Sequence, residues 1–207
     1  MVNSKYLYLA LGDSITAGYG VGFKNSFPSI YSTVLRQQFP DLHYVNLGVN
    51  GLSTGRLVSM VGTQRVGSLV SRSRIITITI GSNDLLSEIK ALASGRQINV
   101  DLALANMSNN LMLLGKSIRI TNPDAVVKVA TIYNPLPSGP LQLYAPQAQG
   151  IIDKANQIIA YWARTYNFVP VPVTQAFRGK EPFLLGPDHF HPNPHGHRVI
   201  ADLFYLS

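Results

Sequence analysis

The chain has 207 residues, of which 46% are hydrophobic and 13% are charged, so it can bury a large core and its composition excludes a disordered protein. It has no cysteine, which excludes disulfides, thiolate-bound zinc, iron–sulfur clusters and cysteine nucleophiles. The net charge of +7 favours acidic partners or anionic surfaces, yet the basic stretch Arg56, Arg65, Arg72 and Arg74 carries no nucleic-acid-binding motif and is interpreted as a solvated face.

The first residues of the sequence do not predict a signal peptide or a membrane-spanning helix. The apolar run at 6–11 is too short for a signal peptide or a membrane-spanning helix. We therefore expect one soluble domain over residues 1–207 with no stable membrane insertion. It is expected to be cytoplasmic by default, or secreted if a signal was removed before residue 1. The sequence favours no particular oligomeric state.

Five apolar runs rich in β-branched residues predict strands, and they lie at 6–11, 43–47, 74–80, 125–133 and 168–173. Because these runs are almost continuously apolar and are separated by helical patterns, they predict a parallel sheet with helices on both faces. The fold class is therefore expected to be α/β, a three-layer α/β/α sandwich on a five-stranded parallel sheet. Pro170 and Pro172 cannot donate to a strand ladder, so the last strand is expected at an edge.

Helices are expected between the strands. The first runs over 27–38 and stops near Pro40, and the second begins at Ser53 and continues toward Val70 with a break at Gly62. The clearest periodicity lies in 101–120, where buried positions are predicted at Met107, Leu111, Leu114 and Ile118. A further stripe is predicted at Ile151, Ala155, Ile158 and Trp162. Asn193 and Pro194 have the character of an N-cap and a first helical residue, which predicts a final helix toward Leu206.

Residues suited to acyl transfer follow the predicted strands, at the edge of the sheet where ligands bind in such folds. Ser14 follows the first strand and needs a neighbouring base to become a nucleophile, a role we assign to His191, oriented by Asp188. An oxyanion could be bound by the backbone N–H groups of Ser14 and Gly48 and by the side-chain amide of Asn83.

Four short blocks carry a family resemblance. GDSI at 12–15, NLGVNG around Gly48, GSND at 81–84 and DHFHP at 188–192 resemble, in order, the four blocks of the SGNH, or GDSL, hydrolases. The resemblance implies Ser14, Asp188 and His191 as the catalytic triad, with Ser14, Gly48 and Asn83 as the oxyanion hole. It also implies a flavodoxin-like strand order and ester hydrolysis without a metal or other cofactor. Ile15 stands where the family name has leucine.

Competing motifs fail at single positions. A nucleophile elbow would need glycine where Thr16 stands, a phosphate loop would need it at Asn110, and a dinucleotide fingerprint would need it at Phe23. Two non-enzymatic readings remain as alternatives. One is a metal-binding protein using the four histidines of 188–197, although Pro192 and Pro194 forbid the continuous helix that would align them. The other is a catalytically silent module that binds anionic surfaces.

The substrate is expected to be an acyl ester or lipid. The proline-rich segment 134–147 is apolar, and we predict that Leu136, Leu141 and Tyr144 line an acyl pocket together with Tyr19 and Phe190. The alternative is that this loop packs on its own domain. The sequence thus favours a serine carboxylester hydrolase for short- to medium-chain acyl groups, acting through an acyl-enzyme. A carbohydrate O-deacetylase, a lysophospholipase or a thioesterase of the same family are the alternatives.

Overall fold

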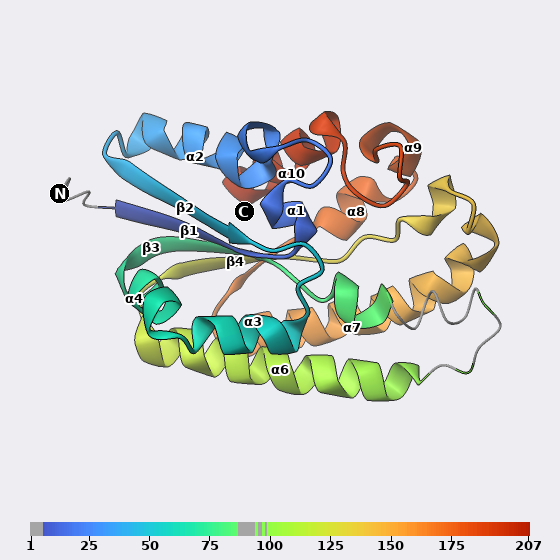
Figure 1. The fold of residues 1–207 in the computed structure, drawn as a ribbon, viewed down its shortest axis with the longest axis horizontal. Helices are drawn as coiled ribbons and strands as arrows, with labels where there is room; N and C mark the ends of the chain where they lie inside the picture. Colours follow the sequence, from blue (N-terminus) through green and yellow to red (C-terminus); the bar gives the residue numbers. More distant parts are fainter. Residues whose placement is uncertain (1–5, 87–93, 95–96, 98) are drawn as a thin grey trace.

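The fold is a five-stranded parallel sheet between two layers of helices, seen in a computed structural model that describes residues 6–86, 94, 97 and 99–207 (Figure 1). The strands are β1 (Tyr6–Gly12), β2 (Leu42–Gly48), β3 (Ser73–Thr79), β4 (Val126–Ala130) and β5 (Val169–Val171). They pair in the order β2-β1-β3-β4-β5, which is the flavodoxin-like order. The predicted fold class is confirmed, and β5, which contains Pro170, lies at an edge as predicted.

The helices divide between the two faces of the sheet (Figure 1). One face is covered by α3 (Thr54–Val61), α4 (Gln64–Arg72), α6 (Val100–Thr121) and α7 (Ala145–Thr165). The other is covered by α2 (Phe27–Gln38), α8 (Val173–Phe177) and α10 (Pro194–Leu206). Short helices and turns complete the loops: α1 (Ser14–Ala17), α9 (Glu181–Leu184), η1 (Phe23–Asn25), η2 (Leu136–Ser138) and η3 (Gln142–Tyr144). In the part of the chain described, no helix is long and apolar enough to cross a membrane.

Capping side chains set the helix boundaries at the predicted places. The side chain of Ser53 accepts a hydrogen bond from the N–H of Arg56 at the start of α3. Helix α3 ends before Gly62, and Thr63 caps α4, so the predicted break is confirmed. At the start of α10, Asn193 Oδ1 accepts the N–H of Gly196 at 2.9 Å and proline occupies the first turn, which confirms the predicted last helix.

Two predicted boundaries are wrong. The fourth strand ends at Ala130 rather than at 133, because the amide of Asn156 takes the place of a neighbouring strand: its Oδ1 accepts the N–H of Ile132 and its Nδ2 donates to the Ile132 carbonyl, both at 2.8 Å. The last strand is likewise confined to Val169–Val171. The backbone at Ile132 is therefore bound by a side chain of α7 and not by a neighbouring strand, so the chain leaves the sheet after Ala130.

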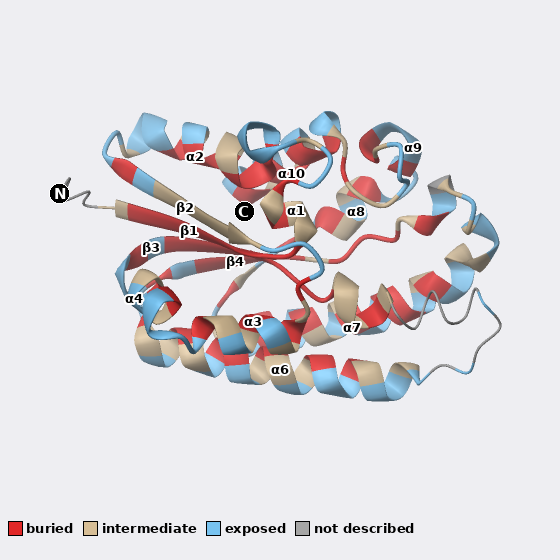
Figure 2. Ribbon diagram, in the orientation of Figure 1, coloured by how far each residue is buried: buried red, intermediate tan, exposed pale blue. Residues whose placement is uncertain are grey.

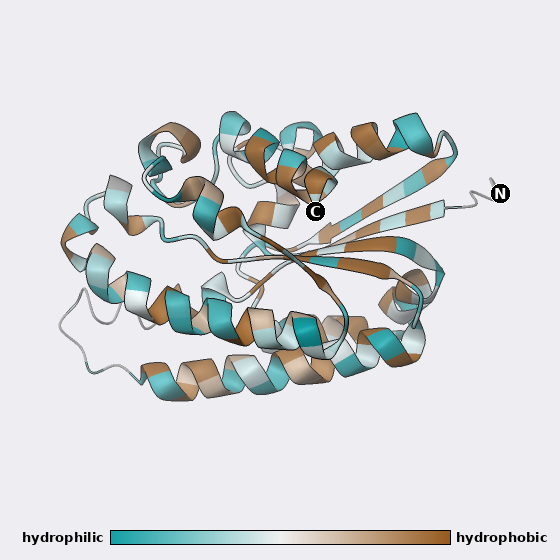
Figure 3. Cartoon of the chain, turned by 180° about the vertical axis from the view of Figure 1, so that it is seen from behind, coloured by the Kyte–Doolittle hydropathy of each residue, from teal (hydrophilic) through white to brown (hydrophobic). Residues whose placement is uncertain are grey.

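The larger core lies between the sheet and helices α3, α4, α6 and α7. The predicted stripe of α6 is confirmed, since Met107, Leu111, Leu114 and Ile118 are fully buried. In α7 the prediction was wrong at Ile158, which is only partly buried, and Ile159 takes the buried place. The strands at the centre are almost continuously buried and hydrophobic, whereas α6 and α7 alternate in hydropathy (Figures 2 and 3). This contrast is what a sheet covered on both faces requires.

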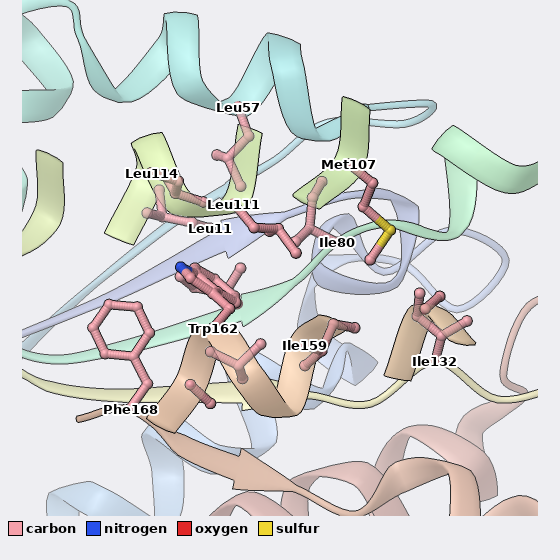
Figure 4. Packing of buried hydrophobic residues seen from close by; sticks show 14 of the residues in the cluster. Leu11, Leu57, Ile80, Met107, Leu111, Leu114, Ile132, Ile159, Trp162 and Phe168 are labelled. Carbon is pink, nitrogen blue, oxygen red and sulfur yellow. The ribbon is translucent and has the colours of Figure 1, made fainter. Parts of the chain in front are cut away.

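Trp162 lies at the centre of this core, among Leu11, Leu111 and Ile159, with the Phe168 ring edge-on at 5.2 Å between centroids (Figure 4). Helix α6 reaches it through Gly115, where a Cβ would lie 2.5 Å from Trp162 Nε1 and 2.3 Å from Tyr166 Cδ2. The missing side chain at 115 therefore allows α6 and α7 to approach closely.

The opposite core holds two polar side chains that the fold keeps from water. His197 is fully buried, and its Nδ1 accepts the N–H of Phe27 at 3.1 Å. Burial lowers the pKa of His197 to about 4, so its imidazole is neutral at pH 7. Lys128, on β4, donates from Nζ to the carbonyl oxygens of Phe204 (2.6 Å) and Ser207 (2.9 Å) at the end of α10. Lys128 thus ties the end of α10 to the sheet, whereas His197 ties the first turns of α10 to the start of α2.

The close approach at Gly115 predicts opposite outcomes for two glycine-to-alanine changes. Alanine is favoured over glycine in a helix interior by about 1 kcal/mol. Gly150→Ala in α7, where nothing lies within 4 Å of the new Cβ, should therefore raise the free energy of unfolding by roughly 0.5–1 kcal/mol. Gly115→Ala should instead lower it by about 2 kcal/mol, because overpacking against two aromatic rings outweighs the propensity gain. Urea unfolding measures both, and equal effects of the two changes would contradict the packing described here.

Candidate active site

The turn after β1 presents Ser14 at the carboxyl edge of the sheet. Gly12 ends the strand at φ 145°, and a Cβ there would lie 2.3 Å from the carbonyl oxygen of Thr79. The Asp13 N–H donates to that same carbonyl at 3.0 Å. Asp13 Oδ1 accepts hydrogen bonds from Thr79 Oγ1 (2.9 Å) and from the N–H of Ile15 (3.0 Å). Strand β3 thus fixes the turn, and Ser14 becomes the first residue of α1.

Asp13 is a buried carboxyl group beside the serine. It is 1% exposed, and burial raises its pKa from 3.8 to about 6, although the hydrogen bonds from Thr79 and Ile15 oppose the increase. Its contacts show that Asp13 fixes the turn that carries Ser14. At neutral pH the group is nevertheless mainly ionised, and this ionisation costs stability.

The three predicted triad residues lie in contact although they are far apart in sequence. His191 Nε2 lies 3.0 Å from Ser14 Oγ, and His191 Nδ1 lies 2.5 Å from Asp188 Oδ2. Asp188 Oδ1 accepts the backbone N–H groups of Phe190 and His191, each at 3.0 Å. Burial alone would raise the pKa of Asp188, but these hydrogen bonds and the His191 ring lower it below 3.8. An ionised carboxylate is therefore aimed at the imidazole at neutral pH.

The histidine loop is fixed from its far side by Tyr133, a residue that the sequence analysis did not select. The buried Tyr133 hydroxyl donates to the Phe190 carbonyl at 2.6 Å, and its ring stacks on Phe177 with centroids 4.5 Å apart. At the end of the loop, the N–H of Asn193 donates to the Leu184 carbonyl at 2.8 Å. No sequence signal marked Tyr133, because it stood inside an apolar run that resembled a strand.

The other histidines do not share the position of His191. His197 is buried against α2, His195 is exposed in the first turn of α10, and His189 is exposed with φ 59°. Across residues 6–86, 94, 97 and 99–207, no three His, Asp or Glu side chains form a group that could hold a metal ion.

Asn83 lies in the helical segment 82–86 that follows β3, and its side chain lines the cavity beside Ser14. Its Nδ2 donates to the Leu52 carbonyl at 3.1 Å, which leaves the second N–H of the amide for another acceptor. The neighbouring Asp84 joins the same two loops, because its carboxylate accepts both the N–H and the hydroxyl of Thr54, at 3.0 and 2.6 Å. The loop after β2 is therefore attached to the loop after β3.

The geometry does not match the predicted role of Gly48. Its N–H already donates to Asn46 Oδ1 at 2.8 Å, and a Cβ on Gly48 would lie 2.3 Å from the backbone nitrogen of Ala17. Gly48 thus allows the end of β2 to pack against α1. Gly51, which the sequence analysis passed over, has φ 72° and open space around its Cα. Within the described residues its N–H has no hydrogen-bond partner. The Asn-Gly pair at 50–51, a turn signal, could have drawn attention to it.

A cavity of about 250 Å³ opens beside the serine. Its apolar lining comes from Ile15, Leu85, Leu86, Ile132, Pro135, Leu136, Ile152 and Phe190, and its polar lining includes Ser14, Asn83 and His191. Leu136 and Phe190 were among the predicted substrate-binding residues.

Three of the predicted substrate-binding residues do not line this cavity. Leu141 and Tyr144 pack against the core on the α6 and α7 side. Tyr19 lies against the His191 ring instead. Ile152 of α7 and the pair Leu85 and Leu86 were not predicted, because only the tertiary fold brings them to the serine.

Comparison with known proteins identifies a family and several similar structures. The profile of the GDSL-like Lipase/Acylhydrolase family matches residues 10–199. The spore germination lipase LipC of Bacillus licheniformis is 25% identical over 202 residues, covering 94% of this chain and 92% of that protein. The crystal structure of the lipase Lip_vut3 from a goat rumen metagenome is similar, with a TM-score of 0.78, 22% identity, and 97% and 96% of the two chains covered. Phospholipase A1 from Streptomyces albidoflavus also has a TM-score of 0.78, with 18% identity and 98% and 99% covered.

The raised pKa of Asp13 predicts a pH dependence that Asp13→Asn should remove. A carboxyl group whose pKa is higher in the folded state destabilises the fold when it ionises, so its cost is absent near pH 4 and complete above about pH 6. Relative to wild type, the variant's free energy of unfolding should therefore rise by about 2 kcal/mol between pH 4 and pH 7. Urea titrations at each pH measure the difference, in which groups common to both proteins, such as His197, cancel. If the difference in free energy of unfolding between the two proteins does not change with pH, burial does not make the ionisation of Asp13 unfavourable.

Proposed function

Because this chain belongs to the GDSL-like lipase/acylhydrolase family, we propose that it is a serine carboxylester hydrolase that works through an acyl-enzyme on Ser14. The observation that carries the proposal is the continuous contact from Ser14 Oγ to His191 Nε2 and from His191 Nδ1 to Asp188 Oδ2. A nucleophile, a base and an orienting carboxylate in this relation are the arrangement that acyl transfer needs.

His191 moves the proton in both halves of the reaction. It takes the Ser14 hydroxyl proton as the oxygen attacks the ester carbonyl, and it gives that proton to the departing alcohol when the tetrahedral intermediate collapses. Water then attacks the acyl-enzyme with His191 again as base, which releases the carboxylic acid and restores Ser14. Asp188 stabilises the imidazolium that forms in each half, and its lowered pKa keeps it ionised throughout.

The oxyanion of each tetrahedral intermediate needs donors that are already in place. We assign this role to the N–H of Ser14, which as a first helical residue has no intrahelical partner, and to the second N–H of the Asn83 amide. For the third donor we propose the N–H of Gly51 in place of that of Gly48, because the Gly48 N–H is engaged by Asn46. The hydrogen bond from Asn83 to Leu52 supports this choice, since it attaches the Gly51 turn to the Asn83 side chain.

The cavity supports acyl groups of short to medium length as substrates. Its walls are mainly apolar, and its volume of about 250 Å³ is small beside the roughly 300–1,000 Å³ of pockets that hold drug-sized ligands. A short to medium acyl chain would lie against lining residues such as Ile152 and Leu136, whereas a long chain would have to leave the cavity. The side chains that line the cavity away from Ser14 also offer few partners for sugar hydroxyls, which favours acyl esters or lipids over acetylated carbohydrates.

The assignment of Ser14 predicts the outcome of covalent labelling. A fluorophosphonate probe should label the wild-type protein once and should not label Ser14→Ala, and the same change should lower kcat for p-nitrophenyl esters by at least about 10³-fold. Circular dichroism and thermal unfolding should be unchanged, because Ser14 Oγ makes no structural contact besides His191 in the described residues. Substantial turnover by a folded Ser14→Ala protein would exclude this serine as the nucleophile.

The assignment of the cavity predicts a change in chain-length preference for Ile152→Ala. Shortening this side chain should lengthen the cavity, so the ratio of kcat/KM for decanoate over hexanoate p-nitrophenyl esters should rise about fourfold, the value of one further buried methylene. Ile159→Ala is the matched control, since this residue is also buried in α7 but does not line the cavity. The control should lose comparable stability with no change in the ratio. The same ratio in wild type and both variants would rule out Ile152 as part of an acyl site.

A further inference from the structure

Tyr19 lies over the face of the base rather than in the cavity. The centroids of the Tyr19 and His191 rings are 4.3 Å apart, and the ring planes meet at 42°. Tyr19 is 48% exposed and does not line the cavity beside Ser14. Its ring therefore covers a part of the imidazole that neither Ser14 nor Asp188 contacts, because those two residues bind the ring nitrogens in the imidazole plane.

The backbone holds Tyr19 in a fixed relation to the nucleophile. The N–H of Tyr19 donates to the carbonyl oxygen of Ser14 at 3.0 Å, and Gly18 turns the chain at φ 81° to make this possible. Farther along the same loop, the Phe23 ring stacks on Tyr44 with centroids 5.7 Å apart. The loop is thus attached on both sides of Tyr19, and the ring position follows from the turn that carries the serine.

We propose that Tyr19 is a positioning residue for His191, whose aromatic face stabilises the imidazolium form that arises during acyl transfer. The inference rests on the proposed function, because the imidazolium forms only if His191 accepts the Ser14 proton. A cation within about 6 Å of an aromatic centroid is attracted by the negative face of the ring, and the contact also resists rotation of the imidazole away from Ser14.

Other groups also act on His191, and the experiment must leave them unchanged. Asp188 contacts Nδ1 directly, while Asp13 and His197 interact with the ring through their charges. The buried Tyr133 lies beside Asp13 and Asp188 on the far side of the loop. None of these residues contacts the Tyr19 ring through a hydrogen bond or a ring stack in the described part of the chain, so substitutions at Tyr19 isolate its own contribution.

Three substitutions at Tyr19 distinguish the effect of its aromatic face from the effect of its hydroxyl group and from the effect of an apolar side chain that only shields His191 from water. Tyr19→Phe keeps the face and should retain wild-type kcat/KM for p-nitrophenyl acetate within about twofold. Tyr19→Leu keeps an apolar cover without the face and should lower kcat about two- to fivefold with little change in KM. The acid limb of its kcat/KM profile should move to lower pH by roughly 0.3–0.7 units, because the protonated form of the base has lost a stabilising partner. Tyr19→Trp should leave the limb at the wild-type pH or move it higher.

The direction of the shift decides between the proposal and a purely structural role. If the ring only shields the imidazole from water, Tyr19→Leu would hydrate the protonated form and move the acid limb to higher pH, which overturns the proposal. An unchanged profile in Tyr19→Leu, or a defect in Tyr19→Phe as large as in Tyr19→Leu, overturns it as well. If Tyr19→Leu unfolds, Tyr19→Met takes its place as the apolar cover without an aromatic face, with the same expected shift of the acid limb to lower pH and the same overturning results.

Failure of this inference differs from failure of the proposed function. A Ser14→Ala protein that still hydrolyses p-nitrophenyl acetate would remove the acyl-enzyme and the role of Tyr19 together. A Ser14→Ala protein without activity, next to a Tyr19→Leu protein with the wild-type kcat and pH profile, would remove only the role of Tyr19.

Discussion

The contact of 3.0 Å between Ser14 Oγ and His191 Nε2 joins two loops that are 177 residues apart, and the site depends on it. Each partner has its own buried anchor. On one side Thr79 of β3 binds Asp13, and on the other side Tyr133, just beyond β4, binds the Phe190 carbonyl. Thr79 ends β3, and Tyr133 follows β4 just after Ile132, which the Asn156 side chain of α7 holds in place, so both anchors are fixed by the sheet and the layer that covers it. The contact between Ser14 and His191 is therefore held in place by buried residues, although both residues lie on loops.

Asp13, at one of these anchors, lowers the stability of the fold. Asp13 is ionised at neutral pH although it is buried, and its raised pKa measures how unfavourable that state is. The same carboxylate accepts the N–H of Ile15 and the hydroxyl of Thr79, so it caps the helix that begins with Ser14. A group that weakens the fold while holding the nucleophile is the trade that functional sites commonly show. Asp188 carries the opposite balance, since its hydrogen bonds lower its pKa and favour its charge.

Local signals in the sequence predicted most of the fold, and failures arose where a distant side chain decided the outcome. Helix caps and the stripe of α6 were predictable because their partners lie three or four residues away. The end of β4 was not, because Asn156 from α7 replaces a strand neighbour at Ile132. Gly48 shows the same limit: a glycine at a strand end indicates close approach, but the sequence does not tell what approaches, and here it is the backbone of Ala17. Tyr19 was predicted to line the cavity but contacts His191 instead, and this contact too depends on residues that are distant in the sequence.

Two different parts of the structure carry the proposed catalytic residues and the proposed acyl cavity. The sheet sets the geometry of Ser14 and His191, whereas α7 supplies Ile152 to the cavity and holds the wall around Ile132 through Asn156. Small changes in α7 can therefore reshape the cavity without moving the nucleophile. Proteins similar to this chain carry names as different as spore germination lipase, at 25% identity, and phospholipase A1, at 18% identity and a TM-score of 0.78. A sheet edge that fixes Ser14 and His191, combined with a cavity wall that α7 can change separately, is a physical reason why one fold can carry different specificities.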